Sequence, residues 1–272
     1  MDLSDEDQVQ VFVVTGGGNG IGRALVLELL KRGAKVAAVD ISEAGLKETS
    51  RLASSTVLST HVVDISKREQ VEALPSAVLA RHGAVDGVIN NAGIVQPFVP
   101  IAQLDYAVIE RVFGVNWLGT LFMTKTFLPH LLAREEAHLV NVSSMGGFMP
   151  FPGQTAYGAS KAAVKLLTEG LQGELAGTSV HVTAVFPGAI GTDILKNSGV
   201  EGLGEASDAA NKTLPPERAA EIIVDAIEKN RVRVMVGNDA WALDWLTRLA
   251  PVRSASFIAK QLKKLTSPKE KP

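Results

Sequence analysis

Short, almost continuously apolar runs alternate along the chain with segments of helical periodicity, and this alternation limits the fold more than any other feature. A strand buried on both faces lacks the alternation of apolar and polar residues, and a helix between two such strands makes them parallel neighbours. Because such crossovers are right-handed, we expect a doubly wound α/β fold, one parallel sheet of about seven strands with helices on both faces. The predicted strands cover residues 9–15, 35–40, 57–64, 85–90, 138–143, 180–186 and 232–236.

Helical spacing fills the gaps between these strands. Ser42 is expected to cap the second helix. No linker rich in Pro or Ser and no internal repeat divides the chain, so we expect one domain over residues 1–272. Within it, we expect a variable substrate loop over residues 193–214 and an amphipathic extension over residues 239–272. The predicted helices cover residues 21–33, 43 onward, 67–82, 104–132 (with room for a kink), 155–175 and 216–229.

Composition removes several classes of function. The 272 residues include no cysteine, which excludes disulfides, thiolate nucleophiles and cysteine-based metal centres. The five histidines lie far apart without metal-ligand spacing, so no metal site is expected. A net charge of −2 gives no electrostatic case for nucleic-acid binding. The acidic N-terminus lacks an apolar signal segment, and no apolar run is long enough to span a bilayer, so we expect a cytoplasmic protein.

The first predicted strand ends in a glycine-rich turn, Thr15-Gly16-Gly17-Gly18-Asn19-Gly20-Ile21-Gly22, which opens a helix. Glycines allow positive φ and let the backbone approach a pyrophosphate at the helix N-terminus. A tight turn without a ligand is the alternative, and the spacing differs from the G-x-G-x-x-G of most dinucleotide folds. The turn alone is therefore weak evidence for a nucleotide.

Asp40 ends the second predicted strand, 18 residues after Gly22. An acid at this place bonds the ribose hydroxyls of adenosine and repels the 2′-phosphate of NADP. Ile41 follows where an arginine would favour NADP, and Asn19 brings no positive charge. Helix capping is the alternative role of Asp40, but Ser42 is better placed for it. The sequence therefore favours NAD.

Three motifs together resemble the short-chain dehydrogenase/reductase family in its classical subtype. They are the turn at 15–22, Asn90-Asn91-Ala92-Gly93 after the fourth strand, and Tyr157-Gly158-Ala159-Ser160-Lys161, and the match covers roughly residues 9–195. The resemblance implies a Rossmann sheet, contact of Asp64 with adenine, and Pro187-Gly188 and Thr192 at the nicotinamide carboxamide. The cofactor-binding set that it implies is Gly16, Asn19, Gly20, Ile21, Gly22, Asp40, Asp64, Ile65, Asn91, Ala92, Gly93, Tyr157, Lys161, Pro187, Gly188, Ile190 and Thr192.

Tyr157 and Lys161 are four residues apart in a predicted helix, so both side chains project from one face. An ammonium group close by, together with the positive nicotinamide ring, is expected to lower the phenol pKa from ~10 by roughly 1–3 units. Tyr157 would then take the alcohol proton as hydride leaves the carbon. By the resemblance, Ser144 bonds the substrate oxygen and Asn116 supports a water-linked proton relay to the lysine. Ser143 is expected only to satisfy backbone groups.

These residues predict an NAD-dependent oxidoreductase that interconverts a secondary alcohol and a ketone. A non-catalytic dinucleotide-binding sensor or scaffold is the alternative, but such a protein is expected to have lost Tyr157 or Lys161. Epimerases and dehydratases among the extended relatives carry other glycine spacings and a longer C-terminal domain. Lys196 and Lys212 are the candidates for binding a substrate carboxylate. The residues expected to form an apolar wall for a bulky substrate are Phe98, Met145, Phe148, Met149, Phe151, Phe186, Ile194 and Leu195.

Helical segments also suggest how copies of the chain associate. The segments 104–132 and 155–175 each carry more apolar surface than one sheet face can cover. Relatives pair these helices across a two-fold axis. We therefore expect a homodimer or homotetramer.

The C-terminal segment lies outside the resemblance. Trp241, Trp245 and Leu249 recur every four residues until Pro251 breaks the pattern, and seven basic residues against one acidic residue follow from Arg248 onward. An apolar helix face beside basic residues is typical of peripheral contact with a membrane surface. The alternative is that the helix packs on the substrate loop or on a partner subunit while the lysines are solvated. We favour the alternative, because the tryptophans precede the basic run and need not share its face.

Overall fold

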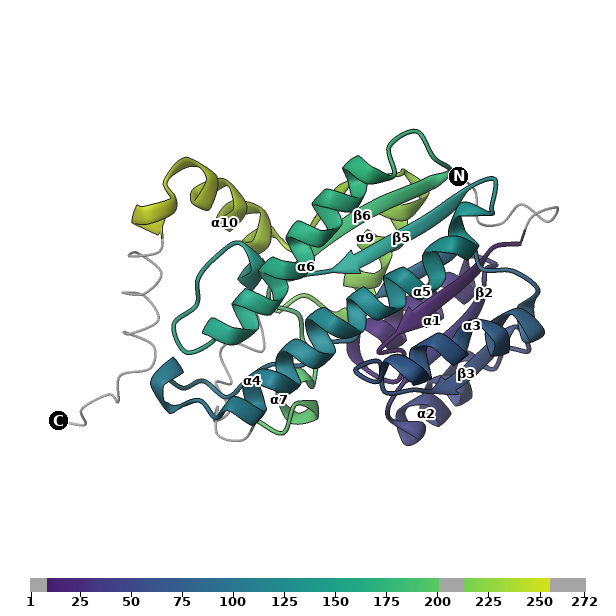
Figure 1. The fold of residues 1–272 in the computed structure, drawn as a ribbon, viewed down its shortest axis with the longest axis horizontal. Coiled ribbons are helices and arrows are strands. Elements are labelled where there is room, and N and C mark those ends of the chain that lie inside the picture. The colour runs from purple at the N-terminus through teal and green to yellow at the C-terminus, as the bar shows by residue number, and fades with distance from the viewer. Residues whose placement is uncertain (1–8, 201–212, 255–272) are drawn as a thin grey trace.

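Seven parallel strands form one sheet in the computed structural model, which describes residues 9–200 and 213–254 (Figure 1). The strand order is β3-β2-β1-β4-β5-β6-β7, so the chain turns back between β1 and β4 and leaves a crevice where those strands end. This confirms the predicted doubly wound α/β fold. The strands are β1 (Val11–Thr15), β2 (Lys35–Asp40), β3 (Leu58–Val62), β4 (Gly87–Asn90), β5 (Ala137–Val142), β6 (Val180–Pro187) and β7 (Arg233–Val236).

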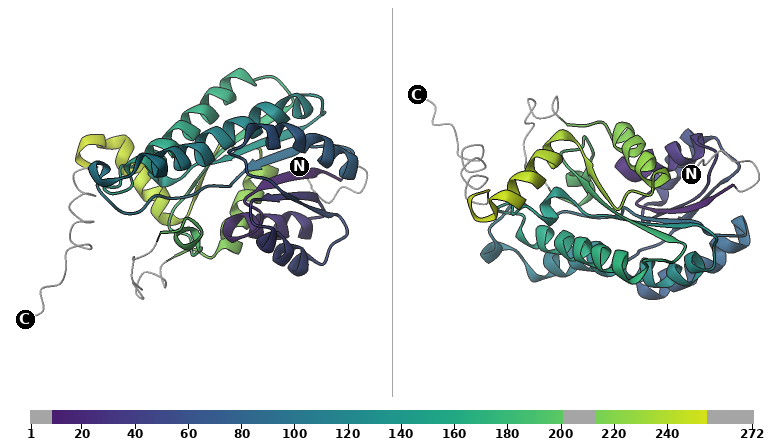
Figure 2. Two further views of the ribbon diagram at one scale, coloured as in Figure 1. Left: turned by 60° about the horizontal axis from the view of Figure 1, so that its bottom comes forward. Right: turned by 90° about the horizontal axis from the view of Figure 1, so that it is seen from above.

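Helices cover both faces of this sheet (Figure 2). On one face, α1 and α9 pack through Leu25, Leu29 and Ile223. On the other, α3, α5 and α6 pack through residues such as Val78 and Phe127. The helices are α1 (Gly20–Lys31), α2 (Glu43–Ala53), α3 (Arg68–His82), η1 (Ile101–Gln103), α4 (Tyr106–Phe113), η2 (Gly114–Gly119), α5 (Thr120–Leu132), η3 (Met145–Gly147), α6 (Thr155–Glu174), α7 (Ile194–Asn197), α9 (Pro216–Glu228) and α10 (Asn238–Leu249).

Two predicted elements differ in detail from the structure. The strand predicted over 57–64 ends at Val62, because Asp64 already belongs to a turn in which its carboxylate accepts hydrogen bonds from the N–H and O–H of Ser66. The helix predicted over 104–132 consists of α4, a π-helix (η2) and α5, and the 3-10 turn η1 precedes it. The kink that its length allowed is thus a π-helical insertion, and Asn116 lies inside it. Within the described ranges, no helix is both long and apolar enough to cross a bilayer.

Candidate active site

The glycine-rich turn after β1 brings the N-terminus of α1 against the end of the sheet. Asn19 caps the helix, since its side-chain oxygen accepts from the N–H of Gly20 at 2.6 Å. Gly16 has φ +71°, a conformation that side chains other than glycine rarely adopt. A Cβ on Gly22 would lie 1.9 Å from the carbonyl oxygen of Gly16, so only glycine lets the first helical turn pack on the loop. The backbone N–H groups at this helix end can bind a phosphate.

Asp40 lies at the end of β2 beside this turn. One carboxylate oxygen accepts from the N–H of Gly18 at 2.9 Å, and the other accepts from the N–H of Ser42 at 2.9 Å. Ser42 in turn caps α2 by accepting from the N–H of Gly45 at 3.0 Å, as the sequence predicted. Asp40 therefore holds the glycine turn in place and keeps a partly exposed carboxylate at the cleft.

Arg23, in the first turn of α1, is a residue of this end that sequence reasoning missed. Its guanidinium donates to the carbonyl of Gly18 and to the hydroxyl of Thr49, the latter at 3.1 Å. The Thr49 hydroxyl donates to the carbonyl of Gly17 at 2.8 Å. Arg23 and Thr49 thus fix the two carbonyls of the turn, and Arg23 also lines the cleft. An arginine directly after the glycine turn was the available signal.

The turn after β4 is tied to β1 at the point where the strand order reverses. The hydroxyl of Thr15 accepts from the N–H groups of Asn91 and Ala92 at 3.0 and 3.1 Å. The Asn91 side chain donates to the carbonyl of Thr15 at 3.1 Å. These bonds hold the start of the predicted Asn91-Ala92-Gly93 wall against the glycine turn.

A cleft of about 740 Å³ runs along these strand ends. All predicted cofactor-binding residues line it except Gly22, whose place is in the packing behind the turn. Of the predicted catalytic set, Ser144, Tyr157 and Lys161 line the cleft and Asn116 does not. Because β1 and β4 separate β2 from β5, Asp40 and Ser144 belong to strand ends roughly 14 Å apart. The cleft therefore has one end at Asp40 and another at Ser144.

Tyr157 and Lys161 project from α6 toward the end of β5. The Lys161 ammonium is buried and donates to the carbonyl of Val142 at 2.9 Å, and its burial lowers its pKa to about 8. The Tyr157 phenol lies near the hydroxyl of Ser144, which accepts from the N–H of Gly146 at 3.0 Å. Ser143 instead donates to the carbonyl of Lys161 at 2.7 Å, which confirms the backbone role expected of it.

In the protein by itself, the pKa of Tyr157 shifts in the direction opposite to the one expected with the nicotinamide ring bound. Burial raises the pKa of this phenol, and the nearby Ser144 hydroxyl opposes the rise only in part. The Lys161 ammonium, four residues along the helix, is directed at the carbonyl of Val142. The spacing correctly predicted that the two side chains share one helix face. It did not predict that burial of this face raises the pKa of the phenol.

Asn116 is fully buried and connects three segments. Its side-chain oxygen accepts from the N–H of Ile94 at 2.9 Å, while its amide donates to the carbonyl of Ile94 and to the hydroxyl of Ser160, both at 3.0 Å. Gly93 lies beside it, where a Cβ would approach the Lys161 nitrogen to 3.0 Å. The Asn116 side chain thus orders the backbone next to Lys161.

Two glutamines that carry no sequence motif position the start of α6. The Gln96 side chain accepts from the N–H of Tyr157 at 2.9 Å and donates to the carbonyl of Gly153 at 2.9 Å. Gln154 donates to the carbonyl of Gln96 at 2.8 Å, and both glutamines are buried. No spacing rule could reveal this pair, because it joins two loops that are distant in the sequence.

Asp239, another residue that the motifs did not indicate, fixes the end of β6. Its carboxylate accepts from the N–H of Ala189 at 2.7 Å. A Cβ on Gly188 would lie 2.2 Å from the same carboxylate, so glycine permits this approach. Pro187, Gly188 and the segment after them are thereby held at the cleft from the first turn of α10.

The predicted apolar substrate wall is largely wrong. Of its eight residues only Ile194 lines the cleft, and Met149 and Phe186 are buried. Phe148, Met149 and Phe151 line a separate pocket of about 490 Å³ between η3 and α6. Nearness in sequence to Ser144 and Tyr157 could not tell on which side of the loop each side chain lies. Lys196 is exposed, and Lys212 lies outside the described residues.

Lys161 gives a prediction for stability. An unfolded lysine has a pKa of ~10.4, so at neutral pH the folded protein holds a charge that burial disfavours, at a cost on the order of 3 kcal/mol. Above about pH 8 the folded state releases the proton and this cost falls. Relative to the wild type, Lys161→Met is therefore expected to gain stability at neutral pH and to lose that gain as the pH rises toward ~10.4. Chemical denaturation of both proteins across this range measures the difference, and a constant difference would contradict the buried charge.

Known proteins match this fold and sequence. The family model described as short chain dehydrogenase matches residues 10–201. SadH of Mycobacterium tuberculosis (strain ATCC 25618 / H37Rv), named as an oxidoreductase, is 40% identical over 250 residues, which cover 88% of this chain and 90% of SadH. The structure of a short-chain dehydrogenase/reductase from Burkholderia phymatum in complex with NAD gives a TM-score of 0.78 at 27% identity and covers 97% of both chains. A 3-ketoacyl-(acyl-carrier-protein) reductase from Brucella melitensis, complexed with NADH, gives 0.76 at 29% identity, over 84% of this chain and 95% of that one. The chain belongs to the short-chain dehydrogenase/reductase family of oxidoreductases.

Proposed function

We propose that the protein interconverts a secondary alcohol and a ketone with NAD(H). The observation that carries the proposal is that Ser144, Tyr157 and Lys161 line one end of the cleft together: a hydroxyl beside a phenol, with a buried ammonium four residues after the tyrosine on α6. A hydroxyl and a phenol that meet in this way can both bond one substrate oxygen. Two similar proteins of known structure, one solved in complex with NAD and the other a ketoacyl reductase complexed with NADH, support the same chemistry.

The residues along the cleft fit NAD. The N–H groups at the start of α1 suit the diphosphate, and the glycine turn leaves room for it because side chains there would collide with backbone. Asp40 would bond the adenosine ribose, and Pro187-Gly188 and Thr192 would hold the nicotinamide. When bound, NAD accepts the hydride from the alcohol carbon. The carboxylate of Asp40 would oppose the 2′-phosphate of NADP, which favours NAD for this chain.

The chain's own residues would manage the oxygen and its proton. Ser144 donates to the substrate oxygen and orients it, and Tyr157 takes the hydroxyl proton during oxidation and returns it during reduction. Lys161 holds a positive charge in the site, which favours the ionised phenol. Asn116 would support the proton path at Lys161 indirectly, because its side chain holds the N–H and the carbonyl of Ile94 in place. Ile94, Val95 and Ile194 line the substrate end and suit an apolar alcohol.

A turnover screen tests the proposal. Purified protein is given a panel of secondary alcohols and ketones, graded by size and including carboxylate-bearing members, with NAD or NADP, and NADH is followed by its absorbance. We expect turnover of apolar or bulky members with NAD. If NAD binds with ordinary affinity but no member of the panel turns over, the protein is the non-catalytic dinucleotide-binding sensor that the sequence left as the alternative.

We also propose that copies associate through α5 and α6. Leu132 on α5 and Leu166 on α6 expose 44% and 70% of their surface, more than apolar side chains of a buried layer do. Light scattering is therefore expected to give a mass of two or four times 28.8 kDa. Leu166→Lys is expected to lower that mass toward one copy, whereas a stable monomer in the wild type would refute the association.

A further inference from the structure

The helix α10 leaves an apolar stripe uncovered at the margin of the molecule (Figure 1). Trp241, Trp245 and Leu249 expose 61%, 52% and 76% of their surface, and Leu246 exposes 37%. Their spacing puts them on one face of the helix, where the two indole rings lie 6.3 Å apart. These four side chains are therefore the candidates for contact with a further surface, and residues 201–212 of the predicted substrate loop lie outside the described residues.

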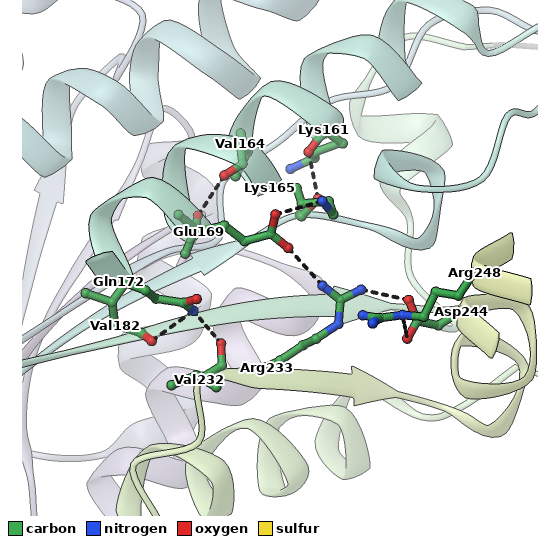
Figure 3. Close-up of polar contacts among 12 residues, drawn as sticks. Lys161, Val164, Lys165, Glu169, Gln172, Val182, Val232, Arg233, Asp244 and Arg248 are labelled. Carbon is green, nitrogen blue, oxygen red and sulfur yellow. Dashed lines mark hydrogen bonds and ion pairs between the residues drawn. The ribbon is translucent and has the colours of Figure 1, made fainter. Parts of the chain in front are cut away.

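The opposite face of α10 is firmly attached to the protein. Ala240 is fully buried, and Asp244 accepts from Arg233 at 2.7 Å. Arg233 also donates to Glu169 of α6 at 3.0 Å, as Figure 3 shows, and stacks on Phe186. Arg248 adds a further bond to Asp244 at 2.9 Å. The helix is therefore held in one orientation, and its apolar stripe is presented outward instead of covering the core.

The basic residues from Arg248 onward indicate which kind of surface the stripe faces. Arg248 in the last turn of α10 and Arg253 among the helical residues 251–254 are exposed. In sequence, residues 253–272 contain six basic residues and one acidic residue, a net charge of +5 in a chain whose total is −2. Two copies of so basic a segment repel each other, whereas an anionic membrane surface attracts it. Tryptophans beside basic residues are typical of helices that lie in a lipid interface.

We propose that the Trp241–Trp245–Leu249 face of α10 binds the surface of an anionic lipid bilayer. The stripe enters the interface between headgroups and acyl chains, while basic side chains contact the lipid phosphates. The inner face keeps its contacts with Arg233 and Ala189, so the whole enzyme is held against the membrane with α10 between the lipid and the end of β6. An apolar substrate dissolved in the bilayer would then be presented near the cleft.

Co-sedimentation of the full-length protein with vesicles tests this proposal. One vesicle set is phosphatidylcholine alone, and the other contains phosphatidylglycerol as well. We expect binding to the anionic set only, weakened by high salt, and lowered by about tenfold or more in Trp241→Ala/Trp245→Ala. Tyr106→Ala is the matched control, since it removes an aromatic side chain that is 83% exposed on α4, and it should bind as the wild type does.

Fluorescence gives a second measurement. The chain has three tryptophans, so Trp117→Phe leaves Trp241 and Trp245 as the emitters, and anionic vesicles should shift their emission to shorter wavelength. Absence of binding, or binding that the double variant retains, would overturn the proposal. So would a change of mass in light scattering of the double variant, because the stripe would then be a contact between copies. None of these results depends on turnover, so they are separate from the test of the proposed reaction.

Discussion

Tyr157→Phe is expected to lower kcat by at least ~10²-fold while leaving NAD binding nearly unchanged. The phenylalanine ring can still pack beside Gly146, but the phenol oxygen proposed to exchange the proton is gone. Stopped-flow or steady-state turnover gives kcat, and calorimetry gives the Kd for NAD. The chain has only one other tyrosine, Tyr106, and Tyr106→Phe on the exposed start of α4 is the matched control.

The pH profile gives this result a second readout. Because burial raises the pKa of Tyr157, the phenol is protonated at neutral pH in the protein alone, and alcohol oxidation by the wild type should accelerate as the pH rises. The residual rate of Tyr157→Phe should lack that rise. Turnover retained at the wild-type level would mean that another group is the base.

Asp40→Ala combined with Ile41→Arg is expected to shift the ratio of kcat/KM from NAD toward NADP by about 10²-fold. The double change removes the carboxylate that repels the 2′-phosphate and adds a guanidinium, since Ile41 is already 67% exposed at the cleft. Part of any loss with NAD will come from the turn itself, because Asp40 also holds the N–H groups of Gly18 and Ser42.

Asp40→Asn separates these two effects. The amide keeps one acceptor oxygen for the two backbone N–H groups of Gly18 and Ser42 and carries no negative charge, so it should relax discrimination against NADP at the cost of one hydrogen bond where alanine loses two. The measurement is kcat/KM with each cofactor at saturating alcohol. If the wild type already uses NADP ten times better than NAD, charge repulsion by Asp40 does not determine the choice of cofactor.

The sequence was most informative about features that depend on residues close together in the chain. The inner strands could be found because burial on both faces requires a continuous apolar run, and β2 matches its predicted bounds of 35–40. The glycine turn, Asp40 and the Tyr157/Lys161 spacing could be found because phosphate binding and a shared helix face need particular residues at short separations. Because the strands are parallel, their carboxyl ends lie at one edge of the sheet, and these residues meet there.

What remained hidden depends on contacts between distant segments. Gln96 reaches Tyr157 across 61 positions and Asp239 reaches Ala189 across 50, and neither carries a motif. The misplaced apolar wall has the same cause: whether Phe148 faces the cleft depends on how its loop packs on Phe186, 5.6 Å away between ring centres. The direction of the Tyr157 pKa depends likewise on burial, which a one-dimensional pattern does not contain.

The π-helix from Gly114 to Gly119 has a consequence for how this enzyme can evolve. A continuous α-helix fixes the angular relation of its two ends, so the face that α4 turns to the cleft would dictate the face that α5 turns to the sheet. A π-helix holds one residue more than an α-helix of the same number of turns, and it rotates one end relative to the other. Val115 can therefore line the cleft while Met123 and Phe127 remain in the core. Deleting a single residue between Gly114 and Gly119 would restore the regular helix but turn α5 by about 100°. A substitution such as one at Val115 can thus alter the cleft without turning α5, whereas an insertion or deletion there would move the core out of register.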